Sequence, residues 1–371
     1  MDKAEKTVRE ILALAEIGMD GERPWDLQVT SKEFYRRLLG QGSIALGETY
    51  MDGLWECEQI DVFIYKVLRS GLEHKISVLS LLWPVLWSKM VNLQSKRRAF
   101  IIGEHHYDIG NELFKLMLDD SMAYTCGYWR EADTLAAAQQ AKMDLVCRKM
   151  GLQAGMRVLD IGCGWGSFAK YAAKNYGVSV VGVTVSQEQI DLGRELCTGL
   201  DVDLRFEDYR DVEGRYDRIV SIGMFEAVGP KNFRTFMQTV ERCLQDDGLF
   251  LLHTIGTNTP DLQADPWTIK YIFPNGYLPL QKQIDAATQG IFIMEDWHNF
   301  GTDYDPTIMA WVANVATHRT RLEALGYDHR FYRMWTYWLL SAAGSARARR
   351  NQLWQMVYSK KGLDGGYLPV Q

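Results

Sequence analysis

Short hydrophobic runs alternate with longer amphipathic stretches along the chain from residue 157 onward. The runs with the character of strands cover residues 158–161, 178–185, 202–207, 217–222 and 249–254. Most segments between them have the spacing of amphipathic helices, and buried strands joined by helices are typical of a parallel sheet covered on both faces. The pattern therefore predicts an α/β fold with a doubly wound sheet.

The patterning continues less regularly toward the C-terminus. A polar, proline-containing insertion covers residues 256–290, and a strand-like segment follows at 291–301. Helical spacing over 307–325 and 329–350 predicts two helices, and the hydrophobic run 354–362 predicts a last strand.

The first 95 residues have the pattern of a separate, mainly helical domain. Residues 1–18 form an amphipathic helical pattern whose apolar positions are interrupted by acids, unlike a signal peptide. The most apolar run, residues 76–87, contains Pro84 and is shorter than the ~20 residues that span a bilayer. We therefore expect a soluble protein with an N-terminal helical domain (1–95) followed by an α/β domain (96–371).

Composition narrows the classes of function. The 371 residues carry a formal net charge of −6, which argues against wholesale binding to nucleic acid. None of the six cysteines lies in a C-x-x-C pair, and no His–Cys cluster has the spacing of zinc ligands. We expect reduced, mostly buried thiols in a cytosolic protein, and no metal site.

A glycine-rich loop follows the first strand of the α/β part. Gly162, Gly164 and Gly166 have the spacing G-x-G-x-G, whereas a dinucleotide-binding loop has its third glycine one place later, where this chain has Ser167. The form found here suits S-adenosylmethionine (SAM), which has no pyrophosphate. The strand–loop–helix setting favours this Rossmann-like SAM-binding reading over a glycine-rich turn without a ligand.

Further residues are expected to hold the cofactor. Many SAM-dependent enzymes have an acid after the second strand, and here Thr184 takes that position, so we expect Thr184, Gln189 and backbone groups to meet the ribose. Asp208 and Tyr209 follow the third strand and are expected to hydrogen-bond and flank the adenine; the alternative is an ordinary polar loop. Two more residues complete the expected set: Asp160 and Val185.

Two titratable residues end neighbouring strands of the predicted sheet. Glu226 follows the fourth strand and His253 lies near the end of the fifth, at the edge where doubly wound sheets bind their ligands. A carboxylate in apolar surroundings needs a partner or a function. A histidine on a strand is more often a satisfied core residue, but the two positions together predict a catalytic site.

Several ordered segments carry a close resemblance to the bacterial cyclopropane-fatty-acyl-phospholipid synthases. They include HYDIGNELFKLMLDDSMAYTCGYW, LDIGCGWG, GVTVSQEQ, DYRD, GMFEAVGPKNF, FLLHTIG, YIFPNG, EDWHNFGTDY, LWQMVYS and the N-terminal YMDGLWEC. The related mycolic-acid cyclopropane synthases share the catalytic part but generally lack the N-terminal domain. The phospholipid-acting branch therefore fits better.

The resemblance implies a reaction and a set of site residues. SAM would methylate the cis double bond of an unsaturated phospholipid acyl chain, and a bound bicarbonate would remove a proton so that the cyclopropane ring closes. The bicarbonate ligands map onto Cys126, Glu226, His253, Tyr304 and the backbone of Ile255. Cys126 would then shape the anion site rather than act as a nucleophile; its alternative is a passive buried thiol. Two residues before it are expected to close over SAM: Tyr124 and Thr125.

The chain departs from its relatives at two positions. Ala227 follows Glu226 where many relatives have histidine, which puts the rate in doubt more than the reaction type. Ala342 stands where some relatives have a cysteine in the late helix, so no covalent cysteine catalysis is assigned there. The cationic reaction itself requires aromatic faces and a pocket without water.

A bilayer substrate requires docking on the inner face of the membrane, and a homodimer is implied by resemblance. Two basic regions are candidates: residues 76–87 with the nearby Lys89, Lys96, Arg97 and Arg98, and the arginine-rich residues 347–350. The alternative is that both are internal. The competing functions are an acyl-chain methyltransferase that leaves a methyl or methylene branch, a small-molecule methyltransferase, and a non-catalytic SAM- or lipid-binding protein.

Overall fold

The computed structural model describes residues 2–72, 110–259 and 265–371. These residues form two compact units. Unit 1 comprises Met1–Asn92, Ala264–Pro274 and Tyr304–Asn351, and unit 2 comprises Leu93–Gln263, Asn275–Asp303 and Gln352–Gln371.

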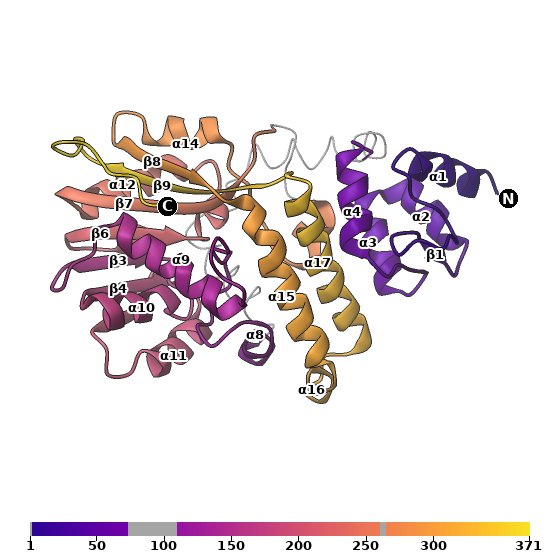
Figure 1. Cartoon of the computed structure of the whole chain (residues 1–371), viewed down its shortest axis with the longest axis horizontal. Helices are drawn as coiled ribbons and strands as arrows, with labels where there is room; N and C mark the ends of the chain where they lie inside the picture. Colours follow the sequence, from indigo (N-terminus) through magenta and orange to yellow (C-terminus); the bar gives the residue numbers. More distant parts are fainter. Residues whose placement is uncertain (1, 73–109, 260–264) are drawn as a thin grey trace. The chain divides into compact units, whose positions relative to one another are not determined.

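Unit 2 is built on a seven-stranded sheet, counted over the described residues, with the order β5-β4-β3-β6-β7-β9-β8 (Figure 1). Its strands are β3 (Arg157–Ile161), β4 (Ser179–Thr184), β5 (Val202–Phe206), β6 (Tyr216–Ile222), β7 (Leu244–Gly256), β8 (Ile293–Asn299) and β9 (Gln352–Ser359). Strands β3 to β7 are parallel, and β9 is antiparallel to both of its neighbours. The predicted doubly wound α/β sheet is confirmed, and every predicted strand overlaps an observed one.

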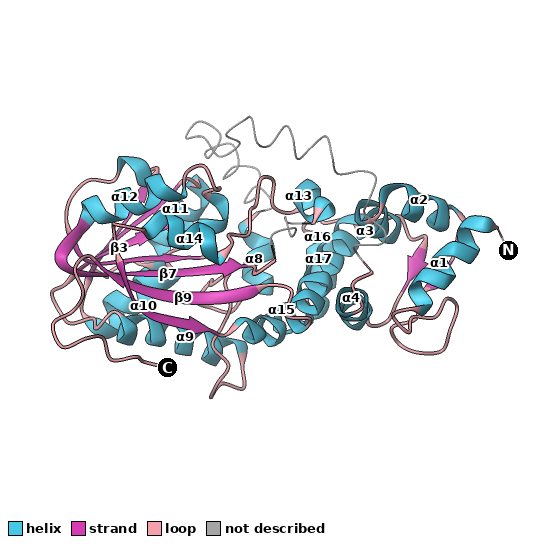
Figure 2. Ribbon diagram, turned by 90° about the horizontal axis from the view of Figure 1, so that it is seen from above, coloured by secondary structure: helices cyan, strands magenta, loops and turns pink. Residues whose placement is uncertain are grey.

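Helices cover both faces of this sheet, as Figures 1 and 2 show. Val158 of β3 packs in a core with α9 and α10, while its neighbours Leu159 and Ile161 pack in a core with α12 and α14. This division follows from the alternation of side chains along a strand. The helices of unit 2 are α8 (Asn111–Met117), α9 (Leu135–Lys149), α10 (Ser167–Tyr176), α11 (Gln187–Leu196), α12 (Phe233–Cys243) and α14 (Gln281–Thr288).

The starts of two helices next to the ligand edge follow from capping side chains. The Thr134 hydroxyl accepts a hydrogen bond from Ala137 N (3.2 Å) at the start of α9, and the Ser186 hydroxyl accepts one from Gln189 N (3.4 Å) at the start of α11. Such caps satisfy amide groups that a helix leaves unpaired at its first turn. The second cap fixes the start of α11 and with it the position of Gln189 in the first turn of that helix.

The sheet has a topological switch point between β3 and β6. The chain runs from β3 outward through β4 to β5, returns to β6, and then continues to β7 in the other direction. Open α/β sheets bind ligands at the carboxyl ends of the strands beside such a point. The glycine-rich loop follows β3 at that edge, and Glu226 follows β6.

Unit 1 is mainly helical, with one two-stranded sheet among its described residues. Its elements are α1 (Lys3–Ala13), β1 (Gln28–Val29), α2 (Glu33–Gln41), α3 (Ser43–Met51), β2 (Trp55–Glu56), α4 (Ile60–Arg69), α13 (Pro266–Tyr271), α15 (Tyr304–Thr317), α16 (Arg319–Ala324) and α17 (His329–Arg347). The sequence analysis placed α13 and α15–α17 in the 96–371 domain, whereas they group with the N-terminal helices. The predicted boundary at 95/96 lies outside the described residues and stays a prediction.

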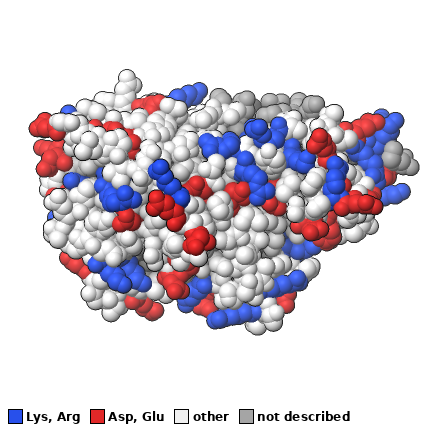
Figure 3. Space-filling view, viewed as in Figure 1, with Lys and Arg blue, Asp and Glu red and all other residues white. Residues whose placement is uncertain are grey.

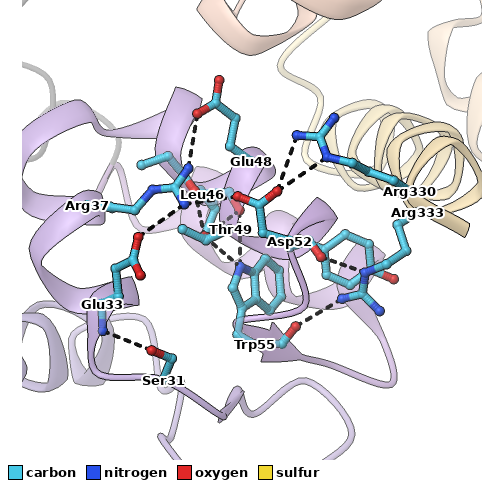
Figure 4. A network of polar contacts seen from close by, with 12 residues as sticks. Ser31, Glu33, Arg37, Leu46, Glu48, Thr49, Asp52, Trp55, Arg330 and Arg333 are labelled. Carbon is cyan, nitrogen blue, oxygen red and sulfur yellow. Dashed lines mark hydrogen bonds and ion pairs between the residues drawn. The ribbon is translucent and has the colours of Figure 1, made fainter.

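A polar network joins α17 to the N-terminal helices within unit 1 (Figure 4). Arg37 pairs with Asp52 (3.0 Å), and Arg330 of α17 pairs with the same carboxylate (3.2 Å). The buried Arg333 donates to the carbonyl groups of Tyr50 (2.6 Å) and Trp55 (3.2 Å). Because these contacts use side chains far apart in the sequence, hydrophobic periodicity alone did not reveal the grouping.

All six cysteines lie among the described residues as free thiols and five are buried, as predicted. No described helix is both long and apolar enough to span a bilayer. On the face that Figure 3 shows, acidic and basic side chains are interspersed.

The structure describes one of the two candidate docking regions, residues 347–350. Arg347 lies inside unit 1, where it pairs with Asp61 (2.8 Å) and Asp305 (2.8 Å). This arginine is therefore engaged by carboxylates and does not contribute a free positive charge to a docking surface. Residues 76–87 and the four basic residues near them lie outside the described residues.

Candidate functional site

The glycine-rich loop adopts the backbone conformation that its sequence requires. Gly162, Gly164 and Gly166 have φ angles of 85°, 56° and 79°, in the left-handed region that favours glycine. A Cβ at Gly162 would overlap the side chain of Met224, whereas one at Gly164 would meet only Gln189 Nε2, at 4.0 Å. The first glycine is therefore required by packing as well as by conformation, and the second leaves its surroundings open.

A cavity opens beside this loop at the switch point. Five residues of the predicted cofactor set line it: Tyr124, Thr125, Asp160, Gly164 and Gln189. The other lining residues are Met122, Lys142, Cys163, Trp165, Ser167, Phe168, Ile222 and Gly223. Residues from the segment before the sheet, the loop after β3 and the end of β6 therefore line the same cavity.

One wall of the cavity is formed by Tyr124 and Trp165, which both pack against Phe114, a residue that is not part of the lining. The ring of Phe114 lies 5.1 Å from that of Tyr124 and 4.9 Å from that of Trp165, between ring centres. The Trp165 indole donates a hydrogen bond to Asn111 Oδ1 (2.8 Å), which fixes its orientation. Aromatic faces attract cations, so this wall suits the sulfonium of SAM.

The remaining predicted cofactor residues have structural partners. The Thr184 hydroxyl lies 2.9 Å from Gln189 Oε1 and donates to it. Asp208 caps a short 3-10 helix, accepting from Arg210 N (3.0 Å), and it also pairs with the Arg210 guanidinium (3.0 Å). Tyr209 packs 5.3 Å from Phe236 in the core. Six residues of the predicted set are not among the residues that line the described cavity: Gly162, Gly166, Thr184, Val185, Asp208 and Tyr209.

Glu226 is anchored at one carboxylate oxygen and left open at the other. It lies in a short 3-10 helix whose first residue, Phe225, stacks on Phe233 at 4.3 Å. Its Oε1 accepts a hydrogen bond from Ile255 N (2.6 Å), and its Oε2 is buried with no partner among the described residues. Burial raises the pKa of Glu226 to about 7, against the lowering effect of its backbone hydrogen bonds.

His253 is buried on β7, and its side chain has one hydrogen-bond partner among the described residues. Gln355 stands directly opposite it on β9, with the amide Nε2 3.2 Å from the imidazole Nδ1. Because an amide NH₂ can only donate, this assignment makes Nδ1 the acceptor and leaves the ring proton on Nε2. His253 Nε2 is buried and has no partner in the described part of the chain. Burial, and then the positive charges of Lys142 and Lys149, lower the pKa of His253 well below its ordinary value, so the imidazole is neutral.

Close contacts between backbone segments bring three of the predicted anion ligands, Cys126, Glu226 and His253, to one edge of the sheet. Gly223 N donates to His253 O (2.9 Å), and a Cβ at Gly223 would lie 2.7 Å from the Thr125 methyl group. Cys126, next to Thr125, is fully buried and its thiol donates to Gly127 O (3.2 Å). The ends of β6 and β7 and the segment of Cys126 therefore meet at this edge.

Two other predicted ligands are placed differently. The amide of Ile255 is occupied by Glu226, so in this structure its N–H orients the carboxylate. Tyr304 is the first residue of α15 in unit 1, whereas the other ligands lie in unit 2. Its role as a bicarbonate ligand stays a prediction.

The sequence analysis missed three polar residues that support the site. Lys142 and Gln139 lie on the buried face of α9; Lys142 Nζ donates to Thr125 Oγ1 (2.9 Å), and Gln139 Nε2 donates to Thr125 O (2.7 Å). The signal for both was present, because they share the helical spacing of Leu135 and Ala138 and so fall on the apolar face. Gln355 was the third, and its contact depends on strand register.

Comparison with known proteins agrees with this geometry. Residues 94–356 match the family described as mycolic acid cyclopropane synthetase. A cyclopropane-fatty-acyl-phospholipid synthase of Escherichia coli (strain K12) is 50% identical over 98% of this chain and 95% of its own length. Cyclopropane mycolic acid synthase 2 of Mycobacterium leprae is 35% identical over 69% of this chain and 92% of its own.

Solved structures give the same result. The cyclopropane synthase MmaA2 of Mycobacterium tuberculosis superposes with a TM-score of 0.67 at 30% identity, covering 70% of this chain and 98% of that one. The mycolic acid cyclopropane synthase CmaA1, solved with S-adenosylhomocysteine (SAH) and CTAB, superposes with a TM-score of 0.66 at 30% identity, covering the same shares. The matches span both the glycine-rich loop and the acid after β6, and the chain belongs to the cyclopropane synthase family of SAM-dependent methyltransferases.

Proposed function

We propose that this protein is a cyclopropane-fatty-acyl-phospholipid synthase. It transfers the methyl carbon of SAM to the cis double bond of an unsaturated phospholipid acyl chain and closes a cyclopropane ring. The observation that carries the proposal is a pair of buried polar atoms, Glu226 Oε2 and His253 Nε2, which have no partner among the described residues and belong to residues at the carboxyl ends of adjacent strands. The likeness to the E. coli enzyme over almost the whole chain supports the phospholipid substrate.

The reaction requires a base, because the methylated chain must lose a proton from the transferred carbon before the ring closes. We propose that bound bicarbonate supplies this base. Neutral His253 has an Nε2–H group to donate to an anion, and Glu226 has a free oxygen to accept from a hydroxyl. The donor and acceptor thus fit the two sides of a hydrogen carbonate ion.

The other proposed ligands complete the anion site. The Cys126 thiol, which in this structure donates to Gly127 O, and the Tyr304 hydroxyl are the further proposed donors, and the Ile255 amide holds Glu226 in place. The raised pKa of Glu226 makes it sensitive to pH near neutrality, since it must be ionised to accept the bicarbonate proton.

The cavity at the switch point is the proposed SAM site. Its open position at Gly164 allows close approach of the cofactor, and the rings of Tyr124 and Trp165 in its lining suit the positive sulfur. Thr184 and Gln189, already hydrogen-bonded to one another, are the proposed ribose contacts. We keep Val185, Asp208 and Tyr209 as proposed neighbours of the cofactor.

The protein is further proposed to act as a homodimer at the inner membrane surface, where its phospholipid substrate lies. The membrane part of this proposal rests on the chemistry of the substrate, since an acyl chain must be reached in a bilayer, and the homodimer rests on the family resemblance alone. Vesicle binding that weakens as salt rises would support an electrostatic part of the association.

The decisive experiment identifies the lipid product. Unsaturated phospholipid vesicles are incubated with methyl-labelled SAM and bicarbonate, and the acyl chains are examined by mass spectrometry with and without hydrogenation. Mild hydrogenation saturates a methylene branch and leaves a cyclopropane ring intact. The mass of the acyl chain after hydrogenation therefore distinguishes a methylene branch from a ring. A methylene or methyl branch would establish the related acyl-chain methyltransferase, and SAM binding without any product would favour a non-catalytic protein.

Substituting the acid tests its assignment. Glu226→Gln keeps an oxygen for Ile255 N and removes the negative charge. We expect turnover to fall by about 100-fold or more, the usual size of a lost acid–base group, with little change in SAH affinity. Wild-type turnover in this variant would mean that Glu226 is only structural.

A further inference from the structure

Gln355 lies between two histidines on the face of the sheet that α9 covers. His253 of β7 and His298 of β8 are its direct neighbours across the strands, and Val357, two residues after Gln355, packs in the core with α9 and α10. Gln355 Nε2 lies 3.2 Å from His253 Nδ1. Gln355 Oε1 and His298 Nδ1 are both buried without a hydrogen-bond partner in the part of the chain that the structure describes. Three polar side chains therefore form one row across β7, β9 and β8.

Hydrogen bonding alone does not decide which way the Gln355 amide points. Burial, with nearby positive charge, lowers the pKa of both histidines, to about 4 at His298, so both rings are neutral. A neutral imidazole offers one donor and one acceptor, so either histidine can meet either end of the amide. With the amide turned round, its oxygen would accept from His253 Nδ1–H and its NH₂ group would donate to His298 Nδ1. A further force must therefore select the orientation that leaves the proton of His253 on Nε2.

A buried cation lies close to this row. The side chain of Lys149 on α9 is 0% exposed, and its ammonium group pairs with Asp296 of β8 at 3.0 Å, which is its single side-chain hydrogen bond among the described residues. After burial, the positive charge of Lys149 further lowers the pKa of both His253 and His298, whereas Asp296 opposes this effect at His298 only. At His253 the ion pair therefore acts as a positive charge.

We propose that Lys149 sets the orientation of the Gln355 amide and, through it, the tautomer of His253. The oxygen is the negative end of the amide dipole, and a buried cation attracts that end strongly because the protein interior has a low dielectric constant. Oε1 is therefore held on the side of the lysine, and the NH₂ group donates to His253 Nδ1. The turned amide would present its NH₂ group to the ammonium group, which the positive charge disfavours.

The inference rests on the proposed bicarbonate site and deepens it, because His253 donates to an anion through Nε2–H. Lys149 is a positioning residue, since it does not line the described cavity and its effect on His253 passes through Gln355. The ion pair calls for such a role, because a buried pair is often no more stabilising than apolar side chains of similar volume.

The test removes the charge without leaving its partner unpaired. Lys149→Met combined with Asp296→Leu replaces the ion pair by apolar side chains, which should change the melting temperature little. The tautomer of His253 is read from the ¹⁵N chemical shifts of histidine-labelled protein. We expect the ratio of Nε2-protonated to Nδ1-protonated His253 to fall about 10- to 100-fold, the range for a lost interaction with a charged group. Turnover should fall in proportion to the remaining Nε2-protonated fraction, with little change in SAH affinity.

The matched control keeps the charge and disturbs the packing. Lys149→Arg retains a cation that cannot lose its proton and can still pair with Asp296, but its larger side chain overpacks a fully buried position. This variant should have a lower melting temperature than the double variant and should keep the proton of His253 on Nε2. A merely structural role of the pair predicts the opposite order, in which the less stable Lys149→Arg protein loses more turnover than the double variant.

Two results would overturn the proposal. The double variant could keep His253 protonated on Nε2, or Lys149→Arg could move the proton to Nδ1. The proposed reaction is tested separately, because the tautomer is observed without turnover. A wild type with Nε2–H at His253 that forms no cyclopropane product would refute the proposed reaction and support the orientation of Gln355 by Lys149.

Discussion

At the scale of single residues, the site is defined by two side chains that are each held through one of their two polar atoms. Glu226 is fixed through Oε1 and His253 through Nδ1, and the opposite atom of each is buried without a partner in the described residues. Leaving such atoms unpaired destabilises a folded protein by about 1–3 kcal/mol each. The fold tolerates this cost where an occupant will bind, which is why the pair supports an anion site.

The raised pKa of Glu226 predicts a pH dependence of stability. A carboxyl group with an ordinary pKa of 4.5 when unfolded and about 7 when folded holds more proton in the folded state between these values. Stability contributed by this group therefore falls as pH rises from 4.5 to 7, by up to about 3 kcal/mol, and is constant above that range. Urea unfolding of the wild type and Glu226→Gln across this range should show the difference between them falling with pH. A difference that is flat, or that rises, would contradict the raised pKa.

Gln355 predicts the tautomer of His253. With the amide donating to Nδ1, the imidazole carries its proton on Nε2, where the anion is proposed to bind. Gln355→Glu replaces the donor with a carboxylate that accepts from Nδ1–H, so the Nε2 proton is lost from the neutral ring. Turnover should fall by about 100-fold while SAH affinity is retained.

The tautomer itself is measured by ¹⁵N chemical shifts of histidine-labelled protein, with His253→Asn used to assign the resonance. The wild type should show a protonated Nε2 and the Gln355→Glu variant a protonated Nδ1. An Nδ1-protonated ring in the wild type would mean that the Gln355 amide is turned the other way. The reading of His253 as an anion donor would then be wrong.

At the scale of elements, the sequence predicted what depends on local pattern. The strands and the glycine-rich loop were correct because buried strands leave continuous apolar runs and because left-handed turns require glycine. The contact between His253 and Gln355 was missed because it depends on the antiparallel register of β7 with β9, which no local pattern encodes. The placing of Asp208 and Tyr209 at the adenine stays a prediction; among the described residues, Asp208 pairs with Arg210 and Tyr209 packs against Phe236.

The packing of α17 against α4 gives a prediction at this scale. Gly344 allows the two helices to approach closely, since a Cβ there would overlap Asp61 O and lie 3.1 Å from Tyr65 N. Gly344→Ala should therefore lower the free energy of unfolding by about 1–3 kcal/mol, the usual effect of overpacking. Gly40→Ala in α2 is the matched control, because nothing lies within 4 Å of its Cβ, and it should stabilise the protein by about 0.5–1 kcal/mol. Chemical denaturation measures both, and equal effects would contradict the packing argument.

At the scale of the whole molecule, the sequence predicted two parts but not their composition. Hydrophobic patterning assigned residues 304–351 to the larger part, because they follow its strands in the chain. Instead, long-range polar contacts such as that of Arg330 with Asp52 group them with the N-terminal helices. Tyr304, a predicted ligand of the anion, thereby belongs to unit 1, while Glu226 and His253 belong to unit 2.

This grouping changes the expectation for membrane docking. Arg347 belongs to the arginine-rich stretch 347–350, one candidate for contact with anionic lipid, but Asp61 and Asp305 occupy its guanidinium. Arg347→Gln leaves both carboxylates without their partner, so the free energy of unfolding should fall by about 1–2 kcal/mol, allowing for the partial exposure of the arginine. Binding to anionic phospholipid vesicles at fixed salt should stay within about twofold of the wild type, because little free charge is removed. Flotation assays and urea denaturation measure the two quantities on the same variant. Loss of vesicle binding with unchanged stability would return Arg347 to the docking surface and would mean that its carboxylate pairs open when the protein meets the membrane.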